Sequence, residues 1–394
     1  IEGCKSQWKY KAVETEKEAL EGADFVVISI LPGTFDEMES DVHTPEKYNI
    51  YQSVGDTAGP GGILRALRTI PMFEEIAENI KKYCPDAWVI NYTNPMTMCV
   101  KTLYKVFPEI KAFGCCHEVF GTQKLLVNAL EDIKGIKDVK REDIKVNVVG
   151  VNHFTWLTKA QYKDIDIFPV YREFAEKYKD NGFVKKSDEN WMNKYFSCSE
   201  KVKIDLFLRY GSIAAAGDRH LAEFCPGDWY LKDKETVEKW GFALTPVSWR
   251  KGDLEKRLER SEKLYSGEEK FELKETGEEG VQQIRALLGL GDLVTNVNIP
   301  NYGQIPNLPI GAVVETNACF RANSLNPVFA GNILQAVYPL ISRVCGEQEQ
   351  VVDCALNRDL DGVFNAFAAD PNMCISVSDA RKLFDEMVDN TKEY

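Results

Sequence analysis

Three short runs of β-branched and apolar residues alternate with helical patterns in the first third of the chain, and this alternation constrains the fold most. Ala23–Leu31 (ADFVVISIL), Ala87–Tyr92 (AWVINY) and Ile110–Cys116 (IKAFGCC) have the length and composition of buried parallel strands. Apolar residues recur at helical spacing over Ile63–Tyr83, after the first strand. The alternation predicts an α/β fold with a doubly wound, Rossmann-like domain.

Polar and small residues gather where these predicted strands end. Asn94 and Pro95 have the residue types of a helix N-cap and first turn, so a helix is expected to follow. In open α/β sheets, ligands bind beyond the carboxyl ends of the strands. The sequence therefore places a candidate cleft at this edge, with these residues along it: Gly33, Asn91, Asn94, Cys116 and His117.

The pattern changes near Ile144, where Ile144–Phe154 (IKVNVVGVNHF) predicts a strand that opens a second, α+β part. We predict a dinucleotide-binding, Rossmann-like domain over residues 1–143 and a domain for catalysis, substrate binding and oligomerisation over 144–394. A long helix is expected over Val328–Cys345. Ser248–Thr276 is dense in charged residues and is expected to be a solvated helix or a mobile surface segment. No GxGxxG loop follows a strand, so we expect the first βα units of the dinucleotide-binding domain to precede Ile1.

Composition narrows the partners and the compartment. The net charge of −13 argues against nucleic acid and anionic membrane surfaces as partners. The eleven cysteines are odd in number and have no framework spacing, which is typical of reduced thiols in a cytoplasm. No apolar run approaches the roughly 18 residues of a membrane span, and no segment has the pattern of a signal peptide. We therefore expect a cytoplasmic protein.

Two motifs combine a cysteine with a histidine. GCCHE contains Cys116, and GVNHFTW contains His153. A thiolate and an imidazole together suit Zn, Mn, Fe or Ni, and two protein ligands leave positions open for substrate oxygens. The alternative is a buried cysteine beside a histidine that is hydrogen-bonded near Asn152.

Two further segments are dense in groups that could bind or react. GDRHLAEF carries Asp218 and Glu223 as candidate acids or bases. It also carries Arg219, whose guanidinium could bind a carboxylate or phosphate through two hydrogen bonds. The alternative for this motif is a surface cluster of ion pairs. GDTAGPGG, at 55–62, could present backbone N–H groups to a ligand or form a flexible loop. Asn296–Pro309 is expected to be an irregular loop that lines the cleft.

Taken together, these segments resemble glycoside hydrolase family 4, the NAD- and metal-dependent glycosidases. The resemblance runs over nearly the whole chain and rests on motifs in this order: SILPG, GPGG with ALRTIP, NYTNP, GCCHE, GVNHFTW, GDRHLAEF and VNIPNYGQIPNLP. It implies a fold like that of lactate and malate dehydrogenases. The forms GDRHLAEF and SILPG are most similar to the α-galacturonidase subgroup.

The resemblance also implies a mechanism for cleaving α-galacturonides. NAD⁺ takes a hydride from C3 of the sugar, a base removes the acidified C2 proton, and the glycosidic oxygen leaves by elimination. Water then adds at C1 and the bound NADH reduces C3, so no net redox change occurs. A divalent metal, expected to be Mn²⁺, would stabilise the charge that develops on the C2 and C3 oxygens.

Roles carry over from the family by position. Cys116 and His153 match the metal ligands. Asp218 matches a candidate base for C2, and His117 a residue that assists the leaving oxygen. The positions expected along the cofactor are Ser29, Leu31, Gly33, Asn91 and Asn94. The positions expected to bind substrate are Asn94, Asn152, Arg219 and His220.

Several alternatives stay open from the sequence. The enzyme could be an α-glucosidase, α-glucuronidase or 6-phospho-glycosidase of the same family, or an NAD-dependent sugar-acid dehydrogenase on the same fold. A catalytically inactive binding protein is a third interpretation, which the Cys116 and His153 pair and the GDRH motif count against. The expected partner is a small-molecule glycoside, and the expected assembly is a homodimer or homotetramer.

Overall fold

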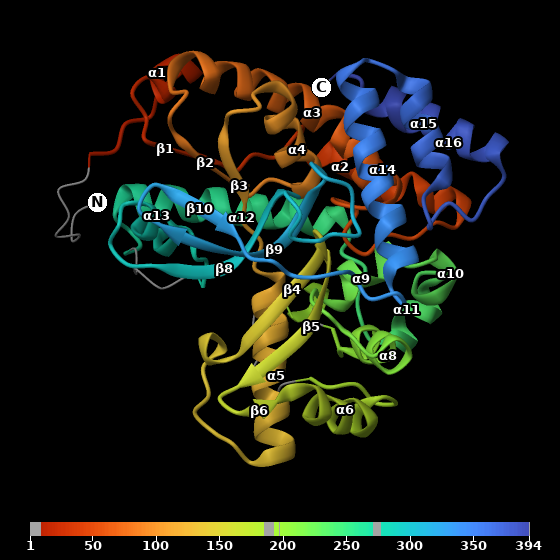
Figure 1. Ribbon diagram of the computed structural model, residues 1–394. Coiled ribbons are helices and arrows are strands. Elements are labelled where there is room, and N and C mark those ends of the chain that lie inside the picture. Colours follow the sequence, from red (N-terminus) through yellow and green to blue (C-terminus); the bar gives the residue numbers. More distant parts are fainter. Residues whose placement is uncertain (1–8, 185–192, 197, 271–276, 394) are drawn as a thin grey trace.

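The computed structural model describes residues 9–184, 193–196, 198–270 and 277–393, and a six-stranded sheet organises its N-terminal part (Figure 1). The strand order is β1-β2-β3-β8-β9-β10. The first three strands pair in parallel and the others antiparallel. Their bounds are β1 (Phe25–Ile28), β2 (Trp88–Asn91), β3 (Lys111–Gly114), β8 (Leu293–Pro300), β9 (Val313–Arg321) and β10 (Ser324–Pro327).

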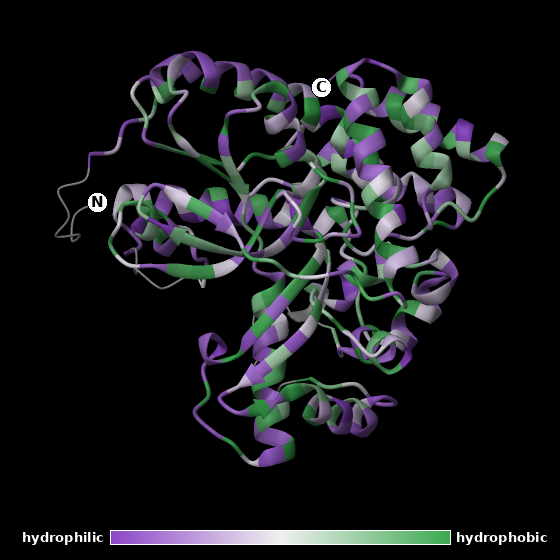
Figure 2. Cartoon of the chain, viewed as in Figure 1, coloured by the Kyte–Doolittle hydropathy of each residue, from purple (hydrophilic) through white to green (hydrophobic). Residues whose placement is uncertain are grey.

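The predicted strand and helix alternation is confirmed. Connecting helices follow the parallel strands: α2 (Phe35–His43) and α3 (Gly59–Tyr83) after β1, α4 (Met96–Val106) after β2, and α5 (Glu118–Lys134) after β3. The short α1 (Glu16–Leu20), on the outer surface, is largely hydrophilic (Figure 2). Fully buried Phe73 and Val89 pack in the core between helices and strands. Burial of this apolar surface is the main force that holds the layers together.

A smaller antiparallel sheet forms the lower part of the molecule in Figure 1. It consists of β4 (Lys145–Val151), β5 (Phe154–Tyr162), β6 (Ile165–Asp166) and β7 (Ile213–Ala214). Helices α5 and α6 (Ile167–Tyr178) pack against it, around a core that includes Leu126, Leu157 and Phe174. The predicted strand Ile144–Phe154 therefore covers β4, a tight turn at Asn152 and His153, and the first residue of β5.

The larger sheet takes strands from both sides of the predicted domain boundary at residues 143 and 144. β8 pairs with β3 through Gly114 and Asn298, so the chain returns to the first sheet after building the second. The division into 1–143 and 144–394 stays a prediction. The prediction of a loop over Asn296–Pro309 is wrong in its first part, because Asn296–Pro300 belongs to β8. In this part asparagine alternates with the buried residues Val297 and Ile299, which is a strand pattern. The many turn-forming residues of the segment led to the loop prediction instead.

Short helices connect the longer elements. They are η1 (Pro45–Tyr48), η2 (Arg141–Asp143), α7 (Asn193–Phe196), α8 (Lys201–Tyr210), α9 (Asp218–Phe224), α10 (Gly227–Tyr230), α11 (Lys234–Trp240) and α13 (Gly280–Leu287). The predicted solvated helix is confirmed as α12 (Val247–Ser266), and residues 271–276 of that prediction lie outside the described residues.

Three C-terminal helices pack beside α3 (Figure 1). They are α14 (Tyr338–Leu356), α15 (Leu360–Ala369) and α16 (Val377–Thr391). The predicted helix over Val328–Cys345 starts too early, because residues 328–337 form no helix and Pro339 stands in the first turn of α14. The described cysteines are free thiols, and no helix among the described residues is long and apolar enough to cross a membrane.

A buried ion pair joins α2 to α3, and it offers a test of the packing. Arg68 donates to both carboxylate oxygens of Asp41, and the two side chains are 3% and 1% exposed. We expect Asp41→Ala to lower the free energy of unfolding by about 3–5 kcal/mol, because Arg68 is left buried and unpaired. Asp353→Ala removes the exposed pair with Lys105 and should cost less than about 1 kcal/mol. Urea unfolding of the full chain measures both, and equal losses would contradict the prediction.

Candidate metal and substrate site

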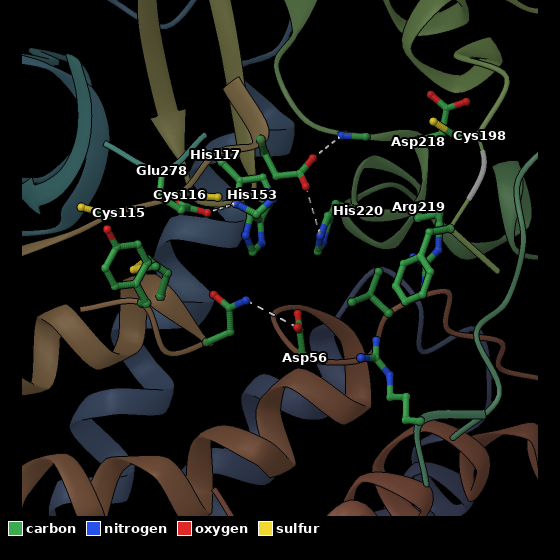
Figure 3. Close-up of a pocket in the computed structure, with 18 residues that line it drawn as sticks. Asp56, Cys115, Cys116, His117, His153, Cys198, Asp218, Arg219, His220 and Glu278 are labelled. Carbon is green, nitrogen blue, oxygen red and sulfur yellow. Dashed lines mark hydrogen bonds and ion pairs between the residues drawn. The ribbon is translucent and has the colours of Figure 1, made fainter. Parts of the chain in front are cut away.

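A cavity of about 550 Å³ lies at the carboxyl ends of the parallel strands (Figure 3). The segments after β2 and β3, the turn between β4 and β5, and helices α9 and α12 all contribute to its wall. This is the edge at which open α/β sheets bind their ligands. Many of the residues in the wall are ionisable or can bind a metal, and they include Asp56, Cys116, His117, Glu118, His153, Asp218, Arg219, His220, Arg250 and Glu278.

Three of these side chains converge as a candidate metal site. One ligand atom from each of Asp56, His153 and His220 lies within 4.8 Å of the others. Asp56 comes from the loop before α3, His153 from the β4–β5 turn, and His220 from α9. The two imidazole rings stack with centroids 4.1 Å apart, and Figure 3 shows both rings and the Asp56 carboxylate facing one open space.

The electrostatics of this cluster favour the ligand forms of His153 and Asp56. Burial, together with the neighbouring His220, lowers the pKa of His153 to about 3, so the ring is neutral near pH 7. A neutral imidazole is the form that binds a metal. Burial opposes ionisation of Asp56, but the charges of His220 and Arg65 hold the pKa of Asp56 below its ordinary value.

Two imidazoles and one carboxylate fit a divalent transition metal. Imidazole suits Zn, Fe and Ni, and carboxylates suit Mn, so the set is compatible with Mn²⁺. Nδ1 of His220 is buried without a hydrogen-bond partner, which is the condition expected of an atom that has a ligand to hold. Thr57 Oγ1 lies 3.1 Å from Nδ1 of His153 and also donates to Asp56, so it ties two of the three residues together.

The sequence-based pair of Cys116 and His153 is only partly reproduced by this cluster. His153 belongs to it, whereas Cys116 lines the same cavity outside the group of three. Burial raises the pKa of the Cys116 thiol, and the nearby Glu315 carboxyl raises it further. The role of Cys116 as a metal ligand therefore stays a prediction. The sequence analysis marked GDTAGPGG as a possible ligand loop through its glycines, but did not identify Asp56 within it as a metal ligand, because one carboxylate among 61 acidic residues carries no signal of its own.

The GDRHLAEF motif is buried, so the alternative of a surface ion-pair cluster is wrong. Asp218, Arg219 and Glu223 are 0%, 8% and 1% exposed. The Asp218 carboxylate accepts the N–H groups of Val202 and Lys203, the first turn of α8. Figure 3 shows Asp218 beside Cys198, away from the space between Asp56 and His153. These contacts give Asp218 a capping role, and its role as the C2 base stays a prediction without support from them.

Arg219 and His220 both line the cavity, and their substrate contacts stay predictions. The Arg219 guanidinium donates through Nε to the backbone oxygen of Ala243, and through one terminal nitrogen to the backbone oxygen of Ser53 and to Thr245. Two of its three nitrogen atoms are therefore engaged within the protein. His220 lies in the candidate metal cluster.

The three predicted asparagines separate into two groups. Asn91 is fully buried and bonds within its own turn, to the backbone of Thr93, and Asn152 is fully buried and donates to Glu315. Both ends of the Asn91 amide are therefore engaged within the protein, whereas Asn152 keeps a buried Oδ1 without a partner, and the contacts of both residues with a cofactor or sugar stay predictions. Asn94 lines the cavity, donates to Asp56 and keeps a buried Oδ1 without a partner. It does not cap α4, because Pro95 holds the N-cap position.

The remaining predicted positions lie at the edges of the site. Ser29 and Leu31 are exposed just beyond β1, and Gly33 follows with φ +82°, a conformation that glycine favours. Their contact with a cofactor stays a prediction. His117 lines the cavity with a 65% exposed side chain, and its Nδ1 lies 2.9 Å from Oε1 of Glu278. This places His117 where the cavity meets solvent.

Comparisons with known proteins agree over nearly the whole chain. The model for family 4 glycosyl hydrolases matches residues 1–132, and the model for the C-terminal domain of that family matches residues 148–373. The α-galacturonidase of Thermoanaerobacterium saccharolyticum is 67% identical over 99% of this chain and 84% of its own length. The α-galacturonidase of Bacillus subtilis is 53% identical over 97% of this chain and 84% of its own length.

Solved structures show the same fold. The crystal structure of the putative glucosidase lplD from Bacillus subtilis has a TM-score of 0.93 and 52% identity, and the match covers 96% of this chain and 86% of that one. The 6-phospho-beta glucosidase of Thermotoga maritima, solved with manganese, NAD⁺ and glucose-6-phosphate, has a TM-score of 0.73 at 21% identity, over 97% of this chain and 84% of its own. The Rossmann-like α/β prediction is confirmed.

The Rossmann-like fold, the cavity lined by ionisable residues at its strand ends, and the similarity to these relatives together identify the protein as a glycosidase. Within that class the chain belongs to glycosyl hydrolase family 4.

Metal titration tests the cluster of three. We expect Asp56→Ala, His153→Ala and His220→Ala each to weaken Mn²⁺ binding by more than about tenfold, because each removes a ligand. His43→Ala changes a histidine outside the cavity and should leave the affinity unchanged. Electron paramagnetic resonance of free Mn²⁺ gives the dissociation constants. If Cys116→Ser abolished binding while Asp56→Ala did not, the cysteine and histidine pair would be the correct set.

Proposed function

We propose that this protein is an α-galacturonidase that hydrolyses α-galacturonides with NAD and a divalent metal, which we expect to be Mn²⁺. The observation that carries the proposal is the match to four proteins named α-galacturonidase, at 53% to 67% identity over 97% to 99% of this chain. Manganese and NAD in relatives of the same fold support the two cofactors. We also propose a cytoplasmic location and a homo-oligomeric assembly, as the sequence led us to expect.

The cavity residues suit this reaction. When bound, NAD supplies a reversible hydride acceptor and the metal supplies a Lewis acid. Asp56, His153 and His220 would hold the metal on one side of the cavity, where it would orient the hydroxyl groups of the sugar. The unpartnered Oδ1 of Asn94 offers an acceptor for one such hydroxyl. His117, at the mouth, lies 2.9 Å from the carboxylate of Glu278 and is placed where it could pass a proton to the departing oxygen.

A uronate carries a carboxylate, and Arg250 is the cavity residue best placed to bind it. Arg250 lies in the first turns of α12 and lines the cavity, and its Nε is buried without a hydrogen-bond partner. Burial lowers the pKa of Arg250, which shows that its charge is partly removed from water. A substrate carboxylate would supply the missing acceptor in a two-pronged contact. Arg219, predicted for this task, has two of its three nitrogen atoms engaged within the protein.

Hydrolysis of an aryl α-galacturonide tests the proposed activity. We expect turnover with NAD⁺ and Mn²⁺ together, and loss of turnover when either is withheld or a chelator is added. In D₂O, deuterium should appear at C2 of the released sugar, because the mechanism removes that proton, and NMR of the product detects it. Net accumulation of NADH would instead indicate a sugar-acid dehydrogenase. Parallel assays of aryl α-glucuronides, α-glucosides and 6-phosphoglycosides test the other activities of the family.

Substitution of Arg250 tests the carboxylate contact. We expect Arg250→Met to raise the inhibition constant of free galacturonic acid by roughly ten- to a hundredfold, because a hydrogen bond to a charged group is lost. The constant for galactose, which lacks the carboxylate, should change little. Arg260→Met is the matched control, because Arg260 lies on the same helix and pairs with Glu269 on the surface. Equal losses for both sugars would show that Arg250 acts on the shape of the site instead.

A further inference from the structure

The loop that carries Asp56 is attached directly to α9, the helix that carries His220. The backbone N–H groups of Val54 and Gly55 donate to the same carboxylate oxygen of Glu223, at 2.7 and 2.9 Å. Glu223 is 1% exposed and stands one turn after His220 in α9. One buried side chain therefore holds the two residues that immediately precede Asp56.

Further contacts join the same two segments. Ser53 Oγ donates to the backbone oxygen of Arg219 at 2.5 Å, and the Arg219 guanidinium donates to the backbone oxygen of Ser53. These reciprocal bonds fix the start of the loop on the residue that precedes His220. The motif GDRHLAEF therefore supplies a candidate metal ligand and the groups that hold the segment carrying another.

The far end of the loop is anchored as well. Gly59 N–H donates to Asp370 at 3.1 Å, and Gly61 N–H donates to the side-chain oxygen of Gln52 at 2.8 Å. Asp56 thus lies between two sets of buried hydrogen bonds. Its carboxylate has little freedom to move relative to His220, even though the loop is rich in glycine.

A neutral side chain could in principle satisfy two backbone N–H groups, and a buried carboxylate is a costly way to do so. Burial raises the pKa of Glu223 to about 7, while the two backbone N–H donors favour its ionised form. In that form its hydrogen bonds are shorter and about twice as strong as neutral ones, which suits a loop that must be held rigidly. Groups that orient metal ligands in this way commonly determine metal affinity.

We propose that Glu223 is a positioning residue that fixes the 53–56 loop on α9, so that Asp56 and His220 are held at metal-binding separation. The proposal rests on the metal site of the proposed function. Glu223 itself touches neither the metal nor the sugar. It acts through Asp56, so its effect should disappear when the Asp56 carboxylate is absent.

The test measures Mn²⁺ dissociation constants on the full chain, with circular dichroism to confirm that each variant is folded. We expect Glu223→Ala to weaken Mn²⁺ binding about 10–100-fold, as for other residues that orient metal ligands. Glu223→Gln keeps the shape of the side chain and should weaken binding in the same direction but less. In an Asp56→Asn background, Glu223→Ala should add little, because the group it positions is already gone.

Glu347→Gln is the matched control. Glu347 is a carboxyl with a buried, unpartnered Oε2 that lines the same small cavity as Glu223, and no described hydrogen bond links it to the loop. Its substitution should leave Mn²⁺ affinity within about twofold, well under 1 kcal/mol. The proposal is overturned if both Glu223 variants bind Mn²⁺ as wild type does, if Glu347→Gln weakens binding equally, or if the effect is unchanged in the Asp56→Asn background.

The same experiment separates this proposal from the proposed function. A wild-type protein that binds Mn²⁺ and shows the expected coupling, yet does not cleave galacturonides, would support Glu223 and contradict the activity. Cleavage by wild type, with Mn²⁺ affinity that does not depend on Glu223, would support the activity and overturn the positioning role.

Discussion

The balance of charge inside one desolvated cavity is the constraint on which the site depends. Burial disfavours every ionised group, so His153 is held neutral, while Asp56 and Glu118 stay ionised because cationic neighbours outweigh the cost of burial. Because burial weakens solvent screening, these ionised carboxylates would also favour a cation at the point where the imidazoles converge. A divalent metal bound there would add to the positive charge that keeps them ionised. The same desolvation makes the remaining donors and acceptors of the cavity effective in orienting a sugar.

The fold meets this constraint by bringing ligands from distant segments onto rigid supports. The parallel strands end at one edge, where the chain leaves β3 through Cys116 and His117, and the β4–β5 turn brings His153 to the same place. Helix α9 contributes another part of the cavity wall. Strands β8 to β10 follow the strands of the smaller sheet in sequence but belong to the larger sheet. Segments from both parts of the chain therefore support this cavity. Such shared support restricts the relative motion of the ligands.

Sequence reasoning located the cleft and much of its wall because those signals are local. Runs of β-branched and apolar residues predicted β1 to β3, and the polar residues at their ends predicted the cleft. An unusual density of ionisable residues marked GDRHLAEF. The direction in which a side chain points is not local. Asn91, Asn152 and Arg219 have the chemistry of ligand-binding residues, yet each is engaged by a backbone or side-chain partner that only the folded chain brings near. The same limit hid the pairing of Glu223 with the loop before Asp56, across 169 residues.

The proposed substrate is an acidic sugar, so an acidic protein could bind it only where the local electrostatic potential is opposite to that of the whole chain. The chain carries a net charge of −13, so long-range electrostatics oppose the approach of a uronate, although salt screens this repulsion beyond about 10 Å. Inside the cavity the relevant charges are the nearby ones. Arg250 is partly desolvated there with an unpaired Nε, and a divalent metal at the Asp56 cluster would add positive charge on the other side of the bound sugar. The carboxylate and the hydroxyl oxygens of one sugar would then meet two separate cationic groups. Binding at two fixed points orients the ring between them, and that orientation is what a reaction at C2 and C3 requires.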